Sequence, residues 1–206
     1  VFNDLAETTR VIAYDRPGYG WSDPSETTSA ASITADLHEG LAALDVAGPI
    51  VLVGHSVGGF YVRHHASVHP DRVVGLVLVD SSHEEQLARV PTPVAEMMES
   101  MQTMMKAMAF GSQFGLLRAL HAAGAHPMLA ADASPRRVAM MNRSAVLSAI
   151  VREYGSFATS MAQVRAVAAP FGDLPIVVLS ATEPPRGIPP EMEQHLEAMQ
   201  AAWREM

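Results

Sequence analysis

The sequence predicts an α/β protein whose mostly parallel sheet is flanked by helices. Three observations support this fold class. Short aliphatic runs at residues 50–53, 73–79 and 175–179 have the composition of strands that are buried on both faces. A stretch with helical spacing of apolar residues precedes the first run, and a second predicted helix lies between the first two runs. Apolar residues make up 49% of the 206 residues and charged residues 17%, which excludes intrinsic disorder as the main state.

The first 49 residues contain one β-leaning run, one loop and one helix. Arg10–Tyr14 favours an extended strand, and residues 15–24 form a loop because they hold two glycines and two prolines. A helix is expected from Thr28, and the Gly-Pro pair at 48–49 ends it. Its apolar residues repeat every three or four positions, at Ile33, Leu37, Leu41 and Leu44.

Strands and helices then alternate as far as residue 82. Ile50–Val53 is predicted to be a strand, and a helix is predicted from Val57 to about His69. Val73–Val79 and Pro175–Leu179 are the next two predicted strands. A helical stretch at residues 191–203 follows. Strand, helix and strand in this order predict a parallel sheet.

Residues 83–172 interrupt the alternation with an Ala- and Met-rich stretch that has no convincing strand. We expect several helices there, broken near Gly111 and around Gly124 and Pro127. The predicted organisation is a core of residues 1–82 and 173–206 with a helical cap insertion at 83–172. Six of the 13 methionines lie within residues 96–108, where they either fill the core of the insertion or line an apolar pocket.

Composition excludes several classes of function. Fourteen basic and 22 acidic residues give a net charge of −8, which disfavours nucleic-acid binding. There is no cysteine, so disulfides and thiolate catalysis are excluded. No apolar run approaches the roughly 20 residues that span a bilayer. No signal peptide is visible, which predicts a cytoplasmic protein, and the missing initial Met indicates a processed chain or an internal fragment. The oligomeric state stays open.

The motif that carries chemistry is Gly54-His55-Ser56-Val57-Gly58, a G-x-S-x-G pattern between a predicted strand and a predicted helix. On such a turn the serine hydroxyl projects above the sheet. Gly54 and Gly58 are expected to relieve crowding at the turn. The Val57 amide, at the start of the helix, is a candidate oxyanion donor. The alternative is a glycine-rich turn that binds phosphate. This segment, however, lacks the lysine that a Walker loop has before its serine or threonine.

Three segments in this order resemble the α/β-hydrolase fold, in particular its cap-bearing, esterase-like members. They are residues 15–22, Gly54–Gly59 and Leu76–His83, which resemble the loop after the fourth strand, the nucleophile elbow and the end of the sixth strand. The resemblance implies a serine hydrolase that acts on a small molecule without a cofactor or metal. It also implies that about three N-terminal strands and the segment with the catalytic histidine lie outside these 206 residues, so the chain alone is expected to be nearly inactive.

The resemblance places the acidic partner of the catalytic histidine after the sixth or the seventh strand. Asp80 is the favoured residue, and Glu183 is the alternative. Among the histidines, His55 and His83 are candidates to line the pocket. His65 and His69 lie one helical turn apart, but no acidic third ligand has the right spacing, so no metal site is predicted.

The loop at residues 15–24 is expected to be structural. Its G-x-G-x-x-D pattern lacks the third glycine of a dinucleotide-binding turn, and Trp21 is expected to pack beside it.

These observations predict a serine hydrolase that forms an acyl-enzyme on Ser56 and acts on an apolar or amphipathic ester, thioester or lactone. Hydrolysis of a C–C bond and perhydrolysis use the same residues and stay open. A serine at position 56, rather than an aspartate, argues against haloalkane dehalogenase and epoxide hydrolase chemistry. The alternative from another class is a non-catalytic protein that binds a small molecule on the same fold.

Overall fold

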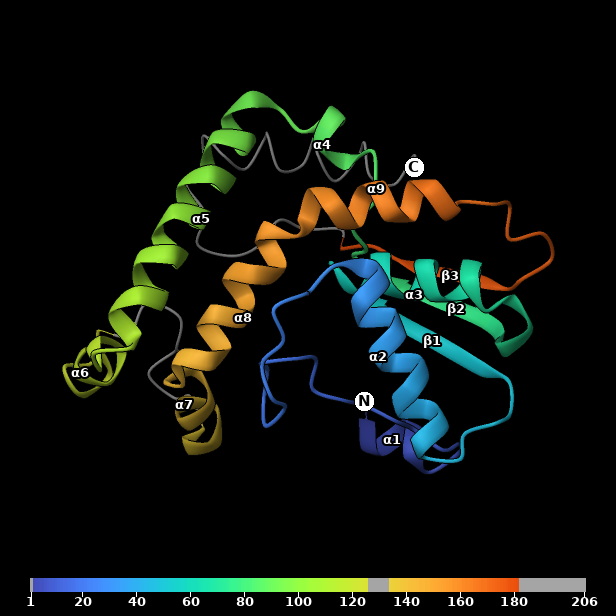
Figure 1. The fold of residues 1–206 in the computed structure, drawn as a ribbon, viewed down its shortest axis with the longest axis horizontal. Helices are drawn as coiled ribbons and strands as arrows, with labels where there is room; N and C mark the ends of the chain where they lie inside the picture. Colours follow the sequence, from blue (N-terminus) through green and yellow to red (C-terminus); the bar gives the residue numbers. More distant parts are fainter. Residues whose placement is uncertain (1, 126–133, 182–206) are drawn as a thin grey trace.

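The computed structural model describes residues 2–125 and 134–181. Its centre is a sheet of three parallel strands in the order β1–β2–β3. Their bounds are Ile50–His55, Val73–Val79 and Ile176–Leu179. Helices α2 (Ala30–Ala43), α3 (Gly58–Val68) and α9 (Phe157–Val167) lie together over the sheet, and α5 to α8 extend to one side (Figure 1). The predicted fold class is confirmed.

The register of the sheet brings the ends of its strands to one edge. Val53 pairs with Val77 and His55 with Val79, and Val79 in turn pairs with Leu179. Because the three strands are parallel, their carboxyl ends meet at the same edge. The loops that leave that edge begin at residues 56, 80 and 180.

The main core lies between the sheet and α3. Leu52, Val62, Ala66, Val73 and Leu76 form one buried cluster there. A second cluster joins α2, α3 and α9 through the buried side chains of Ile33, Phe60 and Met161. The predicted helix from Thr28 and the one at residues 57–69 are confirmed, and Ile33 and Leu41 of the first are buried. The first helix ends at Ala43, before the Gly-Pro pair that was expected to end it, and Leu44 is exposed. The second is buried on all sides from Gly59 to Ala66.

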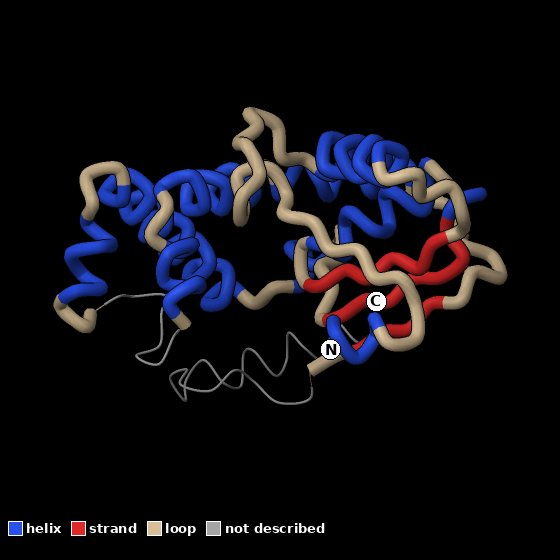
Figure 2. Tube along the Cα trace, turned by 90° about the horizontal axis from the view of Figure 1, so that it is seen from below, coloured by secondary structure: helices blue, strands red, loops and turns tan. Residues whose placement is uncertain are grey.

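Two expectations about the strands are wrong. Arg10–Tyr14 forms no strand, because no described strand lies beside it to complete a hydrogen-bonded ladder. The strands are also not buried on both faces: Val53 is 62% exposed, and Val51 and Val177 are likewise exposed. Figure 2 shows the larger helices on one side of the sheet, so one strand face packs against them and the other is left open within the described residues.

The described part of the insertion contains several helices and no strand, as predicted. Its helices are α4 (Gln86–Arg89), α5 (Thr92–Ser112), α6 (Leu116–Ala122), α7 (Pro135–Met141), α8 (Ser144–Gly155) and α9. The short α1 (Phe2–Ala6) and a 3₁₀ turn, η1 (Pro70–Arg72), complete the described elements. The helix predicted at residues 191–203 lies outside the described residues. The division at residues 83 and 172 stays a prediction.

Candidate active site

Ser56 occupies the sharp turn between β1 and α3. Its backbone has φ of +53°, a left-handed conformation that few non-glycine residues adopt and that costs about 1–3 kcal/mol. The Ser56 N–H donates to the Val79 carbonyl (3.1 Å), and the Ser56 carbonyl accepts from Gly59 (2.9 Å) and Ser82 (2.9 Å). These bonds hold the strained turn against the end of β2. The side chain of Ser56 is exposed at the carboxyl edge of the sheet.

Two glycines allow the chain to pass closely through this turn. A Cβ on Gly54 would lie 2.6 Å from the Gly58 carbonyl oxygen and 2.8 Å from a methyl group of Val62. A Cβ on Gly59 would collide with the side chain of Ser81. The expectation for Gly58 itself is wrong, since a Cβ there would meet open space. The role of Gly59 could not be predicted from the sequence, because this role depends on a contact with the loop after β2.

The Val57 amide has the geometry of an oxyanion donor. Val57 is the N-terminal cap residue of α3, with helical backbone angles. Its N–H has no acceptor among the described residues, and it lies at the positive end of the helix dipole. A free N–H next to an exposed serine hydroxyl is the arrangement that stabilises negative charge on an oxygen bound at the serine.

Asp80 follows β2 as Ser56 follows β1, so the two residues lie at neighbouring strand ends. The Asp80 backbone is also left-handed, with φ of +40°. Its N–H donates to the Leu179 carbonyl (2.8 Å), and its Oδ1 accepts from the Ala181 N–H (2.6 Å). The carboxylate is therefore fixed at the end of β3 while staying exposed. The alternative acid, Glu183, lies outside the described residues.

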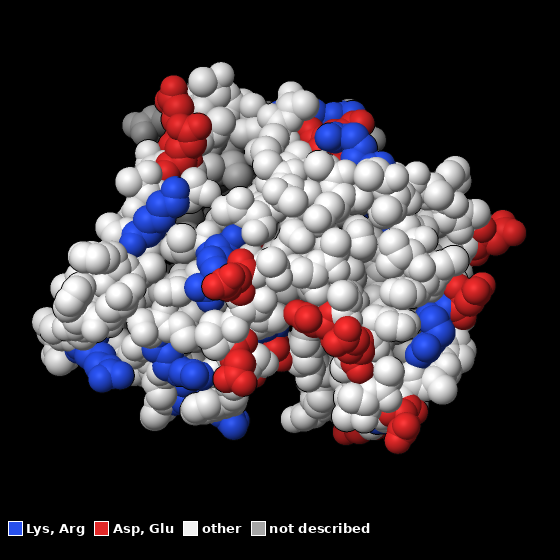
Figure 3. Space-filling view, in the orientation of Figure 1, with Lys and Arg blue, Asp and Glu red and all other residues white. Residues whose placement is uncertain are grey.

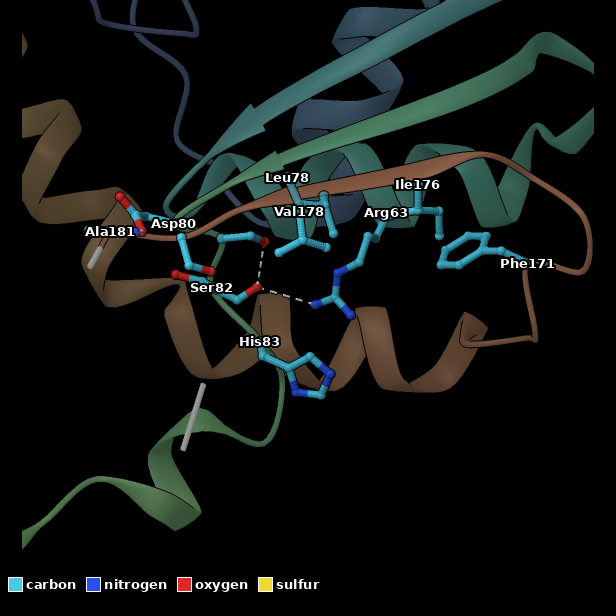
Figure 4. Close-up of a pocket in the computed structure, with 11 residues that line it drawn as sticks. Arg63, Leu78, Asp80, Ser82, His83, Phe171, Ile176, Val178 and Ala181 are labelled. Carbon is cyan, nitrogen blue, oxygen red and sulfur yellow. Dashed lines mark hydrogen bonds between the residues drawn. The ribbon is translucent and has the colours of Figure 1, made fainter. Parts of the chain in front are cut away.

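A cavity of about 290 Å³ lies next to Asp80 (Figure 4). Leu78, Phe171, Ile176 and Val178 give it an apolar wall, and Asp80, Ser82 and Ser180 are among its polar lining residues. Ser56 is not one of the lining residues. The cavity thus adjoins the predicted acid rather than the predicted nucleophile.

His83 also lines this cavity, beside an ion pair between Arg63 and Glu84 (2.5 Å). Figure 4 shows Arg63 reaching toward Ser82, whose carbonyl accepts from the Arg63 guanidinium at 3.3 Å. Burial outweighs the nearby Glu84 charge and lowers the pKa of His83. Burial would raise the pKa of Glu84, but the hydrogen bond and charge of Arg63 outweigh it and hold that pKa below its usual value.

His55 ends β1 with its side chain exposed, and it is not among the cavity-lining residues. Within the described part of the chain, no histidine side chain hydrogen-bonds to Ser56 or Asp80. The structure therefore brings Ser56, Val57 and Asp80 to one edge of the sheet. The assignment of a general base stays a prediction.

A buried polar cluster around Glu153 was missed by the sequence analysis. The Arg16 guanidinium donates to both carboxylate oxygens of Glu153 (2.8 and 2.9 Å). The hydroxyls of Tyr19 (2.5 Å) and Tyr61 (2.8 Å) donate to the same carboxylate. Burial and the Glu153 charge raise the pKa of both tyrosines, so both stay protonated donors at neutral pH. The cluster joins the loop at residues 15–24 to α3 and α8.

The loop at residues 15–24 is also held by contacts within itself. A Cβ on Gly20, which has φ of +48°, would collide with the Asp15 carboxylate. Asp15 also accepts from the Trp21 N–H at 3.2 Å. Trp21 is not packed as predicted, because its side chain is 70% exposed with the Arg143 guanidinium over its ring.

Three histidines gather between α2 and the end of α3. His38 stacks on His69 with the ring centroids 4.0 Å apart, and His65 lies 4.7 Å from His69. Among the described residues, these three and the other His, Asp and Glu side chains form no group that could hold a metal ion. This part of the chain also holds no helix that is long and apolar enough to cross a membrane.

Comparison with known proteins identifies the family. A family model described as the alpha/beta hydrolase family matches residues 1–205. The chain belongs to the alpha/beta hydrolase family. This confirms the resemblance to the α/β-hydrolase fold.

Relatives of this alpha/beta hydrolase match it over part of their length. An uncharacterized protein of Schizosaccharomyces pombe is 45% identical over 84 residues, which is 40% of this chain and 16% of that protein. A 2-(acetamidomethylene)succinate hydrolase of Mesorhizobium japonicum is 33% identical over 132 residues, 63% of this chain and 44% of that enzyme. The chain therefore spans less than half the length of either relative.

A solved structure of a putative acyltransferase from Salmonella enterica has the same fold, with a TM-score of 0.58. It is 17% identical, and the match covers 88% of this chain and 66% of that one.

Proposed function

We propose that this alpha/beta hydrolase is a serine hydrolase that forms an acyl-enzyme on Ser56. The observation that carries the proposal is the exposed serine, held at φ of +53° between β1 and the N-terminus of α3. A strained backbone at an exposed nucleophile is typical of active sites. The hydrolase of Mesorhizobium japonicum supports hydrolysis as the class of reaction.

In the proposed reaction, the Ser56 oxygen attacks the carbonyl carbon of an ester, thioester or lactone. A histidine outside the described residues takes the hydroxyl proton, and Asp80 orients that histidine. The Val57 N–H donates to the developing oxyanion, and such a donor is typically worth about 10²–10³ in rate. Collapse of the tetrahedral intermediate expels the alcohol or thiol, which takes the proton from the histidine. Water then hydrolyses the acyl-enzyme and regenerates Ser56.

The substrate we propose is apolar or amphipathic. The wall of the cavity next to Asp80 consists of aliphatic and aromatic side chains, including Leu78, Ile176 and Phe171. Such walls bind the apolar part of a small molecule, while a few polar groups fix its orientation. The Met-rich α5 offers further apolar surface.

The test is labelling with a fluorophosphonate probe, followed by intact-mass measurement, on these 206 residues and on the complete reading frame that contains them. We expect the complete protein to gain one phosphonyl group, and the Ser56→Ala variant to gain none. Ser100→Ala is the matched control, because it removes an exposed serine of α5 that does not line the cavity. It should label as the unchanged protein does.

Labelling of the 206 residues alone would show that they supply the base themselves, and His83 and His195 would be tested next. A complete protein that folds but does not label at Ser56 would overturn the proposal. It would instead favour a small-molecule-binding protein on the same fold.

A further inference from the structure

The end of the helical insertion carries an exposed aromatic surface. Phe110 at the end of α5 is 66% exposed, and Phe114 in the following turn is 76% exposed. Their rings contact each other edge to face, with the centroids 5.3 Å apart. Leu116, at the start of α6, is 44% exposed. This group stands at the end of the molecule farthest from the sheet (Figure 1).

The side chains of Phe110 and Phe114 are not needed to pack the hairpin formed by α5 and α6. The opposite side of the hairpin is buried through Met108, Ala109 and Leu117, which pack against Leu147 of α8. Gly111 lets α6 approach, because a Cβ there would lie 2.6 Å from the Leu116 side chain. The insertion therefore has its own core, and Phe110 and Phe114 lie outside it.

This end of the molecule is basic, although the protein as a whole is acidic. Residues 101–141 hold four of the 14 basic residues and only one of the 22 acidic residues. Lys106 precedes Phe110 by four residues on α5, Arg118 lies on α6, and both are exposed. In Figure 3 blue side chains gather over α6 and α7, and no red ones lie over α6. α7 adds the exposed Arg136 and Arg137.

We propose that this α5–α6 tip, defined by Lys106, Phe110, Phe114, Leu116 and Arg118, docks on a lipid bilayer that carries anionic headgroups. Aromatic and aliphatic side chains flanked by basic ones are typical of surfaces that bind at a membrane interface. Anionic lipids attract each basic residue, while the acidic remainder of the molecule is repelled from them. The charge distribution therefore selects both the lipid and the orientation. A second copy is disfavoured as the occupant because two basic tips repel each other.

The proposal is tested by co-sedimentation of the full chain with vesicles. One set is made of phosphatidylcholine alone, and the other contains phosphatidylglycerol. We expect binding to the anionic vesicles that weakens as salt is raised. Phe110→Ser combined with Phe114→Ser is expected to weaken it about tenfold or more, because two rings no longer enter the interface. Lys106→Glu combined with Arg118→Glu is expected to have an effect of similar size, because it reverses two charges.

Two control variants change similar side chains elsewhere. Leu44→Ser removes a leucine that is 52% exposed at the end of α2, and Arg10→Glu reverses an exposed charge outside the insertion. Both should bind anionic vesicles as the unchanged chain does. Circular dichroism checks that every variant is folded.

Three outcomes would overturn the proposal. They are no binding of the unchanged chain to anionic vesicles, equal binding to both vesicle types, and equal loss in tip and control variants. Loss of a dimer on size exclusion in the Phe110 and Phe114 variant, without any effect on vesicle binding, would assign the surface to a second copy instead. The readout is binding alone, so none of these outcomes depends on the chemistry of Ser56.

Discussion

At the turn after β1, two of three glycines have no room for a Cβ atom. Gly54, Gly58 and Gly59 lie within six positions, and the sequence motif alone treats the first two as the essential pair. The structure distinguishes them differently, since the space around Gly58 is open while a Cβ on Gly59 would meet Ser81. Gly58→Ala and Gly59→Ala should therefore have opposite effects on the stability of the protein.

Gly59→Ala is expected to destabilise the protein by about 2–4 kcal/mol, because the new methyl group forces the loop at Ser81 away from α3. Gly58→Ala is the matched control, one position earlier in the same helix. It should be neutral or stabilising by up to about 1 kcal/mol, since alanine restricts the unfolded chain and meets nothing in the folded one. Urea unfolding of both variants measures the difference. Equal stabilities would contradict the close contact between Gly59 and Ser81.

At the scale of elements, the Glu153 cluster is the main polar link between α8, α3 and the loop at residues 15–24. Glu153 is almost fully buried, and four donor–acceptor contacts satisfy its carboxylate. Removing a buried carboxylate leaves the Arg16 guanidinium without its partner, and such a loss is costly because the remaining charge stays poorly solvated.

Glu153→Ala is therefore expected to cost about 2–4 kcal/mol of unfolding free energy, slightly less than a fully buried pair because Arg16 keeps some contact with water. Glu85→Ala serves as the control, since it breaks the exposed Glu85–Arg89 pair and should change stability by less than about 1 kcal/mol. Chemical denaturation gives both values. A Glu153 variant as stable as the Glu85 variant would show that the cluster does not hold these elements together.

Elements that depend on local patterns could be predicted from the sequence, and those that depend on distant partners could not. The helices at residues 30–43 and 58–68 follow from apolar spacing and their glycine and proline stops. Arg10–Tyr14 has strand composition, but a strand also needs a neighbour, and none of the described strands lies beside it. The Arg16–Glu153 pair spans 137 residues. Its only local signal is an acid on the buried stripe of α8.

The candidate site likewise has residues that could be predicted from the sequence and others that could not. Ser56 and Val57 follow from the G-x-S-x-G spacing, because that local pattern is typical of a strand-to-helix turn with a projecting serine. The position of Asp80 depends on its bonds to Leu179 and Ala181, which come from a strand about 100 residues later. The cavity beside Asp80 needs Phe171 and Ile176 as well, and no local pattern indicates them.

At the scale of the whole molecule, the histidine cluster makes stability depend on pH. His65 is buried between α2 and α3, and it is packed near His38, His69 and Arg72. Burial, followed by the charge of His69, lowers the pKa of His65 to about 4. The pKa values of His64 and His69 are lowered as well, also chiefly by burial. The folded state therefore keeps these side chains neutral at a pH where the unfolded chain binds protons.

Because the unfolded pKa of histidine is about 6.5, the stability from a neutral His65 is fully present above pH 6.5. It is lost as the pH falls from there toward 4, where the folded side chain also becomes protonated. The expected loss from His65 is about 1 kcal/mol between pH 7.5 and 5.5, and His64 and His69 add to it.

Urea unfolding at pH 7.5, 6.5 and 5.5 measures this loss, and the His65→Gln variant should lose less stability over the same range even if its stability at pH 7.5 is lower. The comparison uses the change with pH, so a packing defect in the variant does not affect it. Carboxylates contribute little above pH 5.5, because their unfolded pKa values lie near 4. If the two proteins lost equal stability, the pH dependence would have to come from groups other than His65, and its burial between α2 and α3 would carry no penalty for the charged form.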